Sequence, residues 1–268
     1  MSKNVVICGY GWLGRYLAAS LSPSTSISAT TRSSEKLKTL KREGIQGIRF
    51  SLGDDSHDLL QALKGATLVL NIPPGRRNTQ LDDFTQQMKT LVDDAKGAGV
   101  AQVIFISTTS VYGDDTTREI KETSSVMPET ASAKAHVDIE RHIAANIENY
   151  QILRLAGLVG PDRHPVNSLS GKSLSAGNKQ VNLVHIEDVV AAIVNIIEGA
   201  CTNTTLHLCS NTHPKRGEYY YDAAIAKQLP PPVFSDTEKR PTGKTINAIY
   251  SWKALGVVPR FADPNAMY

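Results

Sequence analysis

A glycine-rich hexapeptide near the start of the chain limits most strongly what this sequence can fold into. It follows an apolar run at residues 4–8 and opens an amphipathic stretch, so it fits the G-x-G-x-x-G pattern between a strand and a helix. In that setting the first glycine permits a tight turn, the second leaves room for a pyrophosphate, and the third lets helix and strand pack closely. Free N–H groups at the helix start would then favour an anion. The residues predicted to bind a dinucleotide here are Gly9, Tyr10, Gly11, Trp12, Leu13 and Gly14. A glycine turn that only joins strand to helix is the alternative.

The first 155 residues alternate between short β-branched runs and longer amphipathic stretches, which is typical of βαβ units in a parallel sheet. Right-handed crossovers between such units predict an α/β fold with a doubly wound parallel sheet, the Rossmann arrangement. The predicted strands are residues 4–8, 26–31, 45–50, 67–71, 102–107 and 150–155. The predicted helices are residues 12–21, 35–43, 57–63, 81–96 and 131–146.

The alternation of β-branched runs and amphipathic stretches ends after residue 155. Residues 157–177 are rich in Gly, Pro and Ser, and residues 181–184 and 189–197 then predict one more strand and helix that return to the sheet. From about residue 212 the tail carries many prolines with only short elements between them. We therefore predict a Rossmann domain of residues 1–157 and 181–208, and a smaller C-terminal substrate-binding lobe of residues 158–180 and 209–268.

Charge, hydropathy and cysteine content argue against several classes of partner. The 29 basic and 26 acidic residues leave a net charge of +3 and are interspersed, so we expect no nucleic-acid partner. The apolar stretch at residues 189–197 is shorter than the roughly 20 residues that cross a bilayer, so we expect no membrane partner. Three cysteines without a C-x-x-C pair predict a cytoplasmic protein with no disulfide and no metal site.

The end of the second predicted strand bears on which dinucleotide is bound. An Asp or Glu there would accept a hydrogen bond from the ribose 2′-hydroxyl of NAD, but this sequence has Thr31, Arg32 and Ser33. Arg32 can pair with a 2′-phosphate, and the two hydroxyl groups can add hydrogen bonds. We therefore expect NADP as the cofactor, with NAD as the alternative. A solvated arginine at a helix start would account for the same residues.

Two further strand ends carry candidate cofactor contacts. Asp54 follows the third predicted strand and either lies near the adenine or caps the next helix. The end of the fourth strand is expected to pass close to the nicotinamide ribose. Its candidate residues are Asn71, Ile72, Pro73 and Pro74.

Later motifs occur in the order seen in extended short-chain dehydrogenases/reductases. They are Ser107 to Gly113, Arg154-Leu155 and Val184 to Val189. The chain resembles an NAD(P)-dependent epimerase/dehydratase of that class, and residues 154–165 and 181–185 resemble its atypical YeeZ-like branch. The resemblance spans nearly the whole chain. It implies cofactor contacts from Gly157 and Leu158, a small polar substrate such as a nucleotide sugar, and a homodimer formed through exposed helices.

The same resemblance assigns catalytic positions. Typical members place a Ser or Thr at the position of Thr108, which polarises the substrate oxygen, and a Tyr-x-x-x-Lys pair on the next helix. Here Lys134 occupies the lysine position and would hold the nicotinamide ribose, but the tyrosine position is Thr130. A threonine hydroxyl titrates far above the pKa of roughly 10 of a phenol, so Thr130 cannot act as a base near neutral pH.

This departure leaves three interpretations open. In the first, Lys134 remains a ribose anchor while Thr108 and another group such as Tyr112 carry out altered chemistry. In the second, the protein binds NADP and a ligand without turnover, as a sensor or scaffold. In the third, a standard reductase or epimerase takes its proton relay from water, His185 or Tyr219. The alternative for Tyr112 is a structural place in its turn.

The substrate is expected outside the carboxyl ends of the strands, beneath the C-terminal lobe. Arg163 and Lys172 could hold a phosphate or carboxylate there, or could be surface charges. His185 also fits a packed histidine at a strand end. The residues predicted to bind substrate are Arg163, His164, Lys172 and His185.

Overall fold

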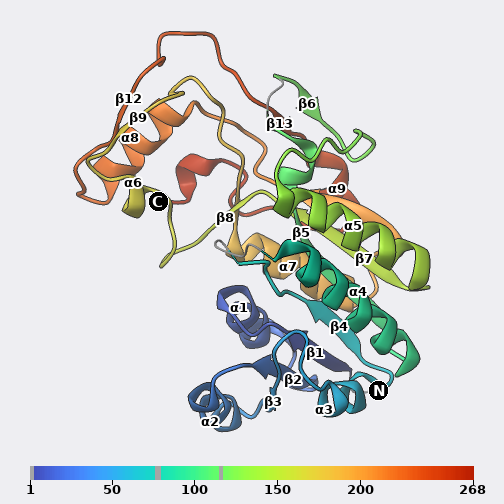
Figure 1. Cartoon of the computed structure of the whole chain (residues 1–268). Helices are drawn as coiled ribbons and strands as arrows, with labels where there is room; N and C mark the ends of the chain where they lie inside the picture. Colours follow the sequence, from blue (N-terminus) through green and yellow to red (C-terminus); the bar gives the residue numbers. More distant parts are fainter. Residues whose placement is uncertain (1–2, 76–79, 115–116) are drawn as a thin grey trace.

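The computed structural model describes residues 3–75, 80–114 and 117–268. Its central layer is a seven-stranded sheet in the order β11-β7-β5-β4-β1-β2-β3, in which every pairing is parallel (Figure 1). The strand order reverses between β1 and β4, so the predicted doubly wound α/β fold is confirmed. The strands are β1 (Asn4–Cys8), β2 (Ser26–Thr31), β3 (Gln46–Arg49), β4 (Thr67–Leu70), β5 (Gln102–Thr108), β7 (Tyr150–Leu155) and β11 (Thr204–Leu208).

Helices cover both faces of this sheet, as a parallel sheet requires. Side chains alternate between the faces: Val5 and Ile7 of β1 belong to one apolar cluster, and Val6 and Cys8 belong to another. The first cluster includes residues of α1 (Trp12–Ser20), α2 (Ser34–Arg42) and α7 (Ile186–Ile197). The second includes residues of α3 (His57–Leu63), α4 (Leu81–Gly97) and α5 (Ala131–Asn146). Figure 1 shows α4 and α5 side by side.

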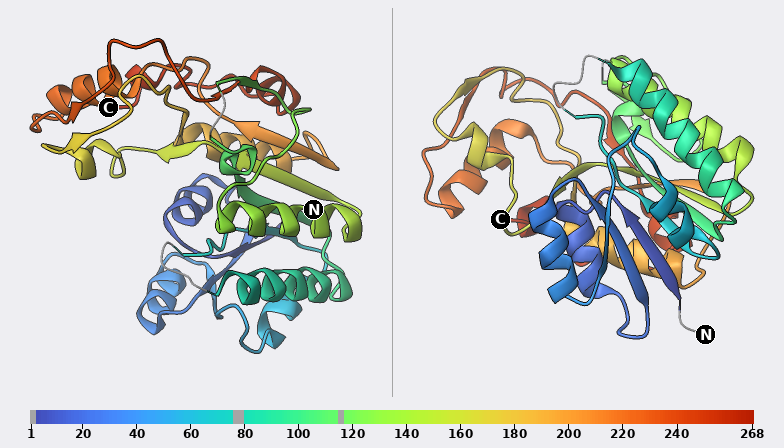
Figure 2. Two further views of the ribbon diagram at one scale, coloured as in Figure 1. Left: turned by 45° about the horizontal axis from the view of Figure 1, so that its top comes forward. Right: turned by 60° about the horizontal axis from the view of Figure 1, so that its bottom comes forward.

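A smaller set of elements lies beside the sheet (Figure 2). Its apolar side chains form a cluster of their own. In it, β9 (Ser173–Leu174) pairs with β12 (Val233–Phe234), and α8 (Arg216–Ala226) packs on the short helix α6 (Val166–Leu169) and the 3-10 helix η2 (Pro264–Ala266). This cluster and the sheet are joined by β8 (Gly157–Val159), which pairs with β10 (Leu183–His185).

The predicted return of residues 181–184 to the main sheet is wrong. These residues overlap β10, which pairs with β8 in a separate two-stranded sheet. The position beside β7 is taken by β11, which the sequence did not predict and which is in register from Thr204 opposite Gln151 to Leu208 opposite Leu155. Because β7 is paired with β5 along one edge and with β11 along the other, it has no free edge for β10.

Part of the C-terminal tail packs on the Rossmann sheet rather than on the smaller cluster. The strand β13 (Thr245–Ile246) pairs with β6 (Glu119–Ile120), and α9 (Ile249–Ala254) follows it. Ile246 and Trp252 belong to the apolar cluster that contains α1 and α7. Within the described ranges, no helix combines the length and the apolar character needed to cross a bilayer.

Candidate functional site

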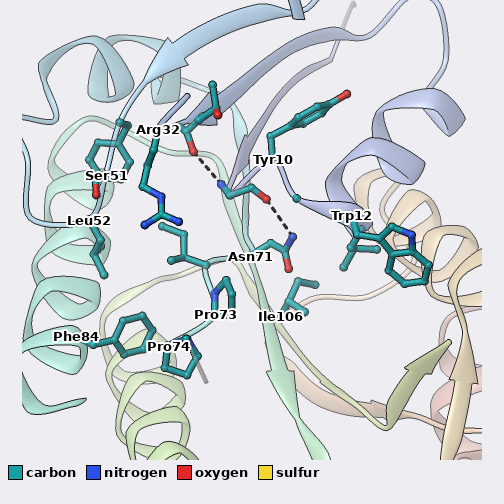
Figure 3. Close-up of a pocket in the computed structure, with 18 of the residues that line it drawn as sticks. Tyr10, Trp12, Arg32, Ser51, Leu52, Asn71, Pro73, Pro74, Phe84 and Ile106 are labelled. Atoms are coloured by element: carbon teal, nitrogen blue, oxygen red, sulfur yellow. Dashed lines mark hydrogen bonds between the residues drawn. The ribbon is translucent and has the colours of Figure 1, made fainter. Parts of the chain in front are cut away.

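A cavity of about 950 Å³ lies at the carboxyl ends of β1, β2 and β4, where the strand order reverses (Figure 3). Its size falls within the roughly 300–1,000 Å³ of small-molecule and cofactor sites. Most of the predicted cofactor residues line it: Gly9, Tyr10, Gly11, Trp12, Leu13, Thr31, Arg32, Ser33, Asn71, Ile72, Pro73, Pro74 and Leu158. Four others do not: Gly14, Asp54, Lys134 and Gly157.

The glycine loop forms one wall of the cavity. Gly9 has a φ of +99°, and a Cβ on it would lie 2.4 Å from the carbonyl oxygen of Asn71. Its N–H donates to Oγ1 of Thr30 at 2.8 Å, and its carbonyl accepts from Nδ2 of Asn71 at 3.2 Å (Figure 3). A Cβ on Gly11 would have no neighbour nearer than the Gly9 carbonyl oxygen at 4.0 Å, so the space beside Gly11 is open. Gly14 lies outside the cavity because it packs α1 on β1, where a Cβ would be 3.1 Å from Ile7.

The end of β2 presents two cations and a helix start to the cavity. Oγ1 of Thr31 accepts the N–H of Ser33 at 3.2 Å, and Oγ of Ser33 caps α2 by accepting the N–H of Lys36 at 3.3 Å. The side chains of Arg32 and Lys36 are exposed and line the cavity. Lys36 was not predicted from the sequence. It lies three residues after Ser33, the cap of α2, and residues at this spacing lie on the same side of a helical turn. This spacing is the signal by which Lys36 could have been predicted.

The remaining wall is largely apolar. Figure 3 shows Leu52, Pro74 and Phe84 around one end of the cavity with Arg32, and Ile106 near the other end. The sequence did not lead us to assign these lining residues to the cofactor: Thr30, Lys36, Phe50, Ser51, Leu52, Gly75, Gln80, Asp83, Phe84, Gln87, Ile106 and Leu155. After β3 it is thus Ser51 and Leu52, not Asp54, that line the cavity. Nor is Asp54 the capping group, because the N–H of His57 at the start of α3 donates to Asp55 at 3.0 Å.

The three positions that the family resemblance marks as catalytic lie at the carboxyl end of β5 and the start of α5. Oγ1 of Thr108 accepts the N–H of Ser110 at 3.2 Å. Oγ1 of Thr130 caps α5 by accepting the N–H of Ala133 at 3.1 Å. Lys134 is exposed in the first turn of α5, and within the described residues it forms no ion pair. None of the three lines the cavity.

Tyr112 belongs to a buried polar network instead of the cavity wall. It is 2% exposed, and its hydroxyl lies 3.1 Å from Nδ1 of His207 and accepts from Nη1 of Arg154 at 3.0 Å. Nε2 of His207 donates to the carbonyl of Asn247 at 2.7 Å, so in the neutral ring Nδ1 is the acceptor and the Tyr112 hydroxyl donates to it. Burial raises the pKa of Tyr112, which opposes ionisation of the phenol.

Of the four predicted substrate residues, the structure brings only Arg163 to the cavity. His164 is buried in the smaller cluster, where its Nε2 lies 2.8 Å from the Tyr219 hydroxyl and burial lowers its pKa to about 4. Lys172 is exposed and lies between α6 and β9. His185 caps α7 by accepting the N–H of Glu187 at 3.4 Å, and burial lowers its pKa.

Comparison with known proteins identifies the family. Residues 9–198 match the family model described as NAD(P)H-binding. The chain belongs to this NAD(P)H-binding family. The resemblance to the YeeZ-like branch is confirmed as well, because Protein YeeZ of Escherichia coli strain K12 is 33% identical over 99% of this chain and 98% of that protein.

Solved structures with the same fold include two epimerases. UDP-glucuronic acid 4-epimerase from Bacillus cereus, in complex with NAD, has a TM-score of 0.81 at 14% identity, covering 98% of this chain and 95% of that one. MoeE5 in complex with UDP-glucuronic acid and NAD has a TM-score of 0.79 at 21% identity, covering 98% and 97%. ADP-L-glycero-D-manno-heptose-6-epimerase from Helicobacter pylori has a TM-score of 0.81 at 16% identity, covering 99% and 94%. At these identities the likeness is one of fold.

For a member of the NAD(P)H-binding family, the cavity has the parts that a dinucleotide requires. The open space beside Gly11 at the start of α1 suits a pyrophosphate, because backbone N–H groups there have no partner within the helix. The apolar end near Leu52 and Phe84 suits a base. Among the described residues, no group of His, Cys, Asp and Glu side chains is arranged to hold a metal ion.

Proposed function

We propose that this chain binds NADP(H) in preference to NAD(H). The observation that carries the proposal is the end of β2, where Arg32 and Lys36 line the cavity and the first carboxylate after the strand, that of Glu35, does not line it. A guanidinium forms two parallel hydrogen bonds with a phosphate, and the start of α2 adds a favourable dipole. Arg32 and Lys36 would hold the 2′-phosphate, while the glycine loop holds the pyrophosphate.

Calorimetric titration with NADPH and NADH tests this proposal. We expect NADPH to bind at least about 10-fold more tightly than NADH, and Arg32→Ala or Lys36→Ala to weaken NADPH by roughly 10-fold or more with little effect on NADH. Arg42→Ala is the matched control, because Arg42 ends the same helix and does not line the cavity. Equal affinity of the unaltered protein for the two dinucleotides would refute the preference for NADP(H). Equal losses of NADPH and NADH affinity in Arg32→Ala would refute the role of Arg32 in that preference.

The reaction we propose is that of an epimerase/dehydratase or reductase acting on a small polar metabolite, with nucleotide sugars as the first class to test. The structural neighbours include two nucleotide-sugar epimerases, which supports this choice of substrate class. Thr108 would donate a hydrogen bond to a substrate oxygen, and the exposed ammonium of Lys134 would reach the nicotinamide ribose. Thr130 would serve the helix cap rather than proton transfer, so the active site is altered from the usual pattern.

A binding protein without turnover, a sensor or scaffold, is the second candidate. Two observations favour it: position 130 has no titratable acid or base, and the nearby phenol of Tyr112 is enclosed in a buried network. An activity assay distinguishes an enzyme from a binding protein without turnover. The protein is incubated with NADPH or NADP and a panel of nucleotide sugars, and products are followed by NMR. Turnover that disappears in Thr108→Val while NADPH affinity is retained supports the enzyme. NADPH binding without any product across the panel supports the sensor or scaffold.

A further inference from the structure

The turn at residues 160–163 is docked on the first helix through one carboxylate. Nε1 of Trp12 donates to Oδ1 of Asp162 at 2.8 Å, and the Tyr16 hydroxyl donates to the same oxygen at 3.3 Å. Arg15 forms an ion pair with the other oxygen at 3.8 Å. The hydrogen bond from Trp12 lowers the pKa of Asp162, so the carboxylate stays ionised near neutral pH. Three side chains of α1 thus hold Asp162.

The turn is also fixed by its own backbone. The N–H of Gly160 donates to the Arg163 carbonyl at 2.9 Å, and the N–H of Arg163 donates to the Gly160 carbonyl at 3.1 Å. A Cβ on Gly160 would lie 2.9 Å from Cζ2 of Trp12 and 2.7 Å from Cγ2 of Ile186, so this backbone rests directly on the indole. Any residue other than glycine would push the turn away from α1. The backbone of Arg163 therefore has a defined position relative to the glycine loop.

Arg163 is left as a cation that faces the cavity. Its Cζ lies 5.0 Å from the ring centroid of Trp12, the first residue of α1, and the residue lines the same cavity as Gly9 and Gly11. Stacking on the indole restricts the guanidinium without neutralising its charge. Within the described ranges, Arg163 forms no ion pair. The carboxylate next to it in the chain, Asp162, pairs with Arg15 of α1.

We propose that Arg163 binds the pyrophosphate of the dinucleotide, as the side-chain counterpart of the backbone N–H groups at the start of α1. This assignment rests on the proposed NADP(H) binding and replaces the substrate-binding role that the sequence predicted for Arg163. A diphosphate could also come from a nucleotide-sugar substrate. The cofactor is favoured because Arg163 is stacked on Trp12, beside the open space at Gly11, and Arg32 and Lys36 line the end of β2 instead.

Four ligands separate the two sources by titration calorimetry. NADPH and 2′-phospho-ADP-ribose carry the cofactor pyrophosphate, adenosine 2′-monophosphate keeps the adenosine end but lacks it, and UDP represents the diphosphate of a substrate. For Arg163→Ala we expect roughly 10-fold or greater losses of affinity for the first two ligands, as for a charged hydrogen-bonding partner of a phosphate. Affinity for adenosine 2′-monophosphate and UDP should stay within about twofold.

Two further variants make the result decisive. Arg163→Lys keeps the charge but not the planar fork, so its loss should be smaller than that of Arg163→Ala. Arg260→Ala removes an exposed arginine that pairs with Glu187 and does not line the cavity, and it should leave all four affinities unchanged. Circular dichroism and melting curves confirm that each variant is folded.

Each outcome decides the assignment. If the unaltered protein binds NADPH and Arg163→Ala binds it equally well, the pyrophosphate role is refuted while NADP(H) binding stands. If Arg163→Ala weakens UDP alone, the residue serves the substrate and the assignment is overturned. If the unaltered protein binds neither NADPH nor 2′-phospho-ADP-ribose, the proposed function and this assignment fail together.

Discussion

Removal of one partner from the buried ion pair between Glu140 and Arg154 should lower the stability of this fold strongly. Nε of Arg154 donates to both carboxylate oxygens of Glu140 at 3.0 and 3.2 Å, and Nη2 donates at 2.6 Å. Ser107 donates to the same carboxylate from β5. The side chains of Glu140 and Arg154 are only 5% and 11% exposed. The pair therefore connects α5 to two neighbouring strands in the interior.

Glu140→Ala leaves the Arg154 guanidinium buried without a counter-ion. Breaking a buried pair in this way costs about 3–5 kcal/mol of unfolding free energy, because desolvation of the remaining charge is uncompensated. In a domain of this size that loss should lower the melting temperature by roughly 6–20 °C. Replacing both partners with apolar residues, as in Glu140→Leu with Arg154→Met, should cost less than Glu140→Ala alone.

Urea titration followed by circular dichroism measures these differences. Glu198→Ala is the control, because its 2.7 Å pair with Lys3 is exposed at 56% and 41% and should contribute less than about 1 kcal/mol. If Glu140→Ala loses no more free energy than Glu198→Ala, the argument from burial is refuted. A double variant less stable than Glu140→Ala would show instead that packing around Arg154, not its unpaired charge, sets the loss.

Three other variants test local features of the structure. Thr130→Ala removes the cap for the Ala133 N–H and should lower the unfolding free energy by about 1 kcal/mol while leaving NADPH affinity unchanged in calorimetry; a loss of NADPH binding would contradict a purely capping role. Gly9→Ala places a Cβ 2.4 Å from the Asn71 carbonyl at a φ of +99°, so NADPH binding and the melting temperature should both fall, and wild-type values of both would refute the clash. Burial lowers the pKa of His164 to about 4 from 6.5, so the unfolded chain takes up this proton first and thermal stability should decline as pH falls from 6.5 towards 4. His164→Gln should decline less steeply over that window, and equal slopes would rule out this contribution.

The Rossmann sheet could be predicted because its strands carry local signals. The strands β1, β2 and β7 begin and end where their runs of β-branched and apolar residues predicted. The glycine loop could be predicted equally well from the sequence. The close contacts that require its glycines are made with residues nearby in the chain or at the end of the neighbouring strand β4. The second cation of the cavity, Lys36, was also within reach of sequence reasoning through its spacing from the helix cap.

Other features depend on residues far apart in the chain. The strand β11 has His207 as its fourth residue, and this polar side chain can be buried because Tyr112 and Asn247 bond its two ring nitrogens. The place of Arg163 depends on the contact between Asp162 and Trp12, which are 150 positions apart. Neither contact leaves a periodicity or a motif in the sequence.

A crystal structure of the complex with NADPH would test the central claim most directly. We predict that the dinucleotide lies in the cavity at the carboxyl ends of β1, β2 and β4, with its 2′-phosphate within hydrogen-bonding distance of Arg32 and Lys36. A dinucleotide bound there with its 2′-phosphate directed to solvent, away from both cations, would contradict the preference for NADP(H). Crystals grown at saturating NADPH with the cavity empty would contradict the account as a whole.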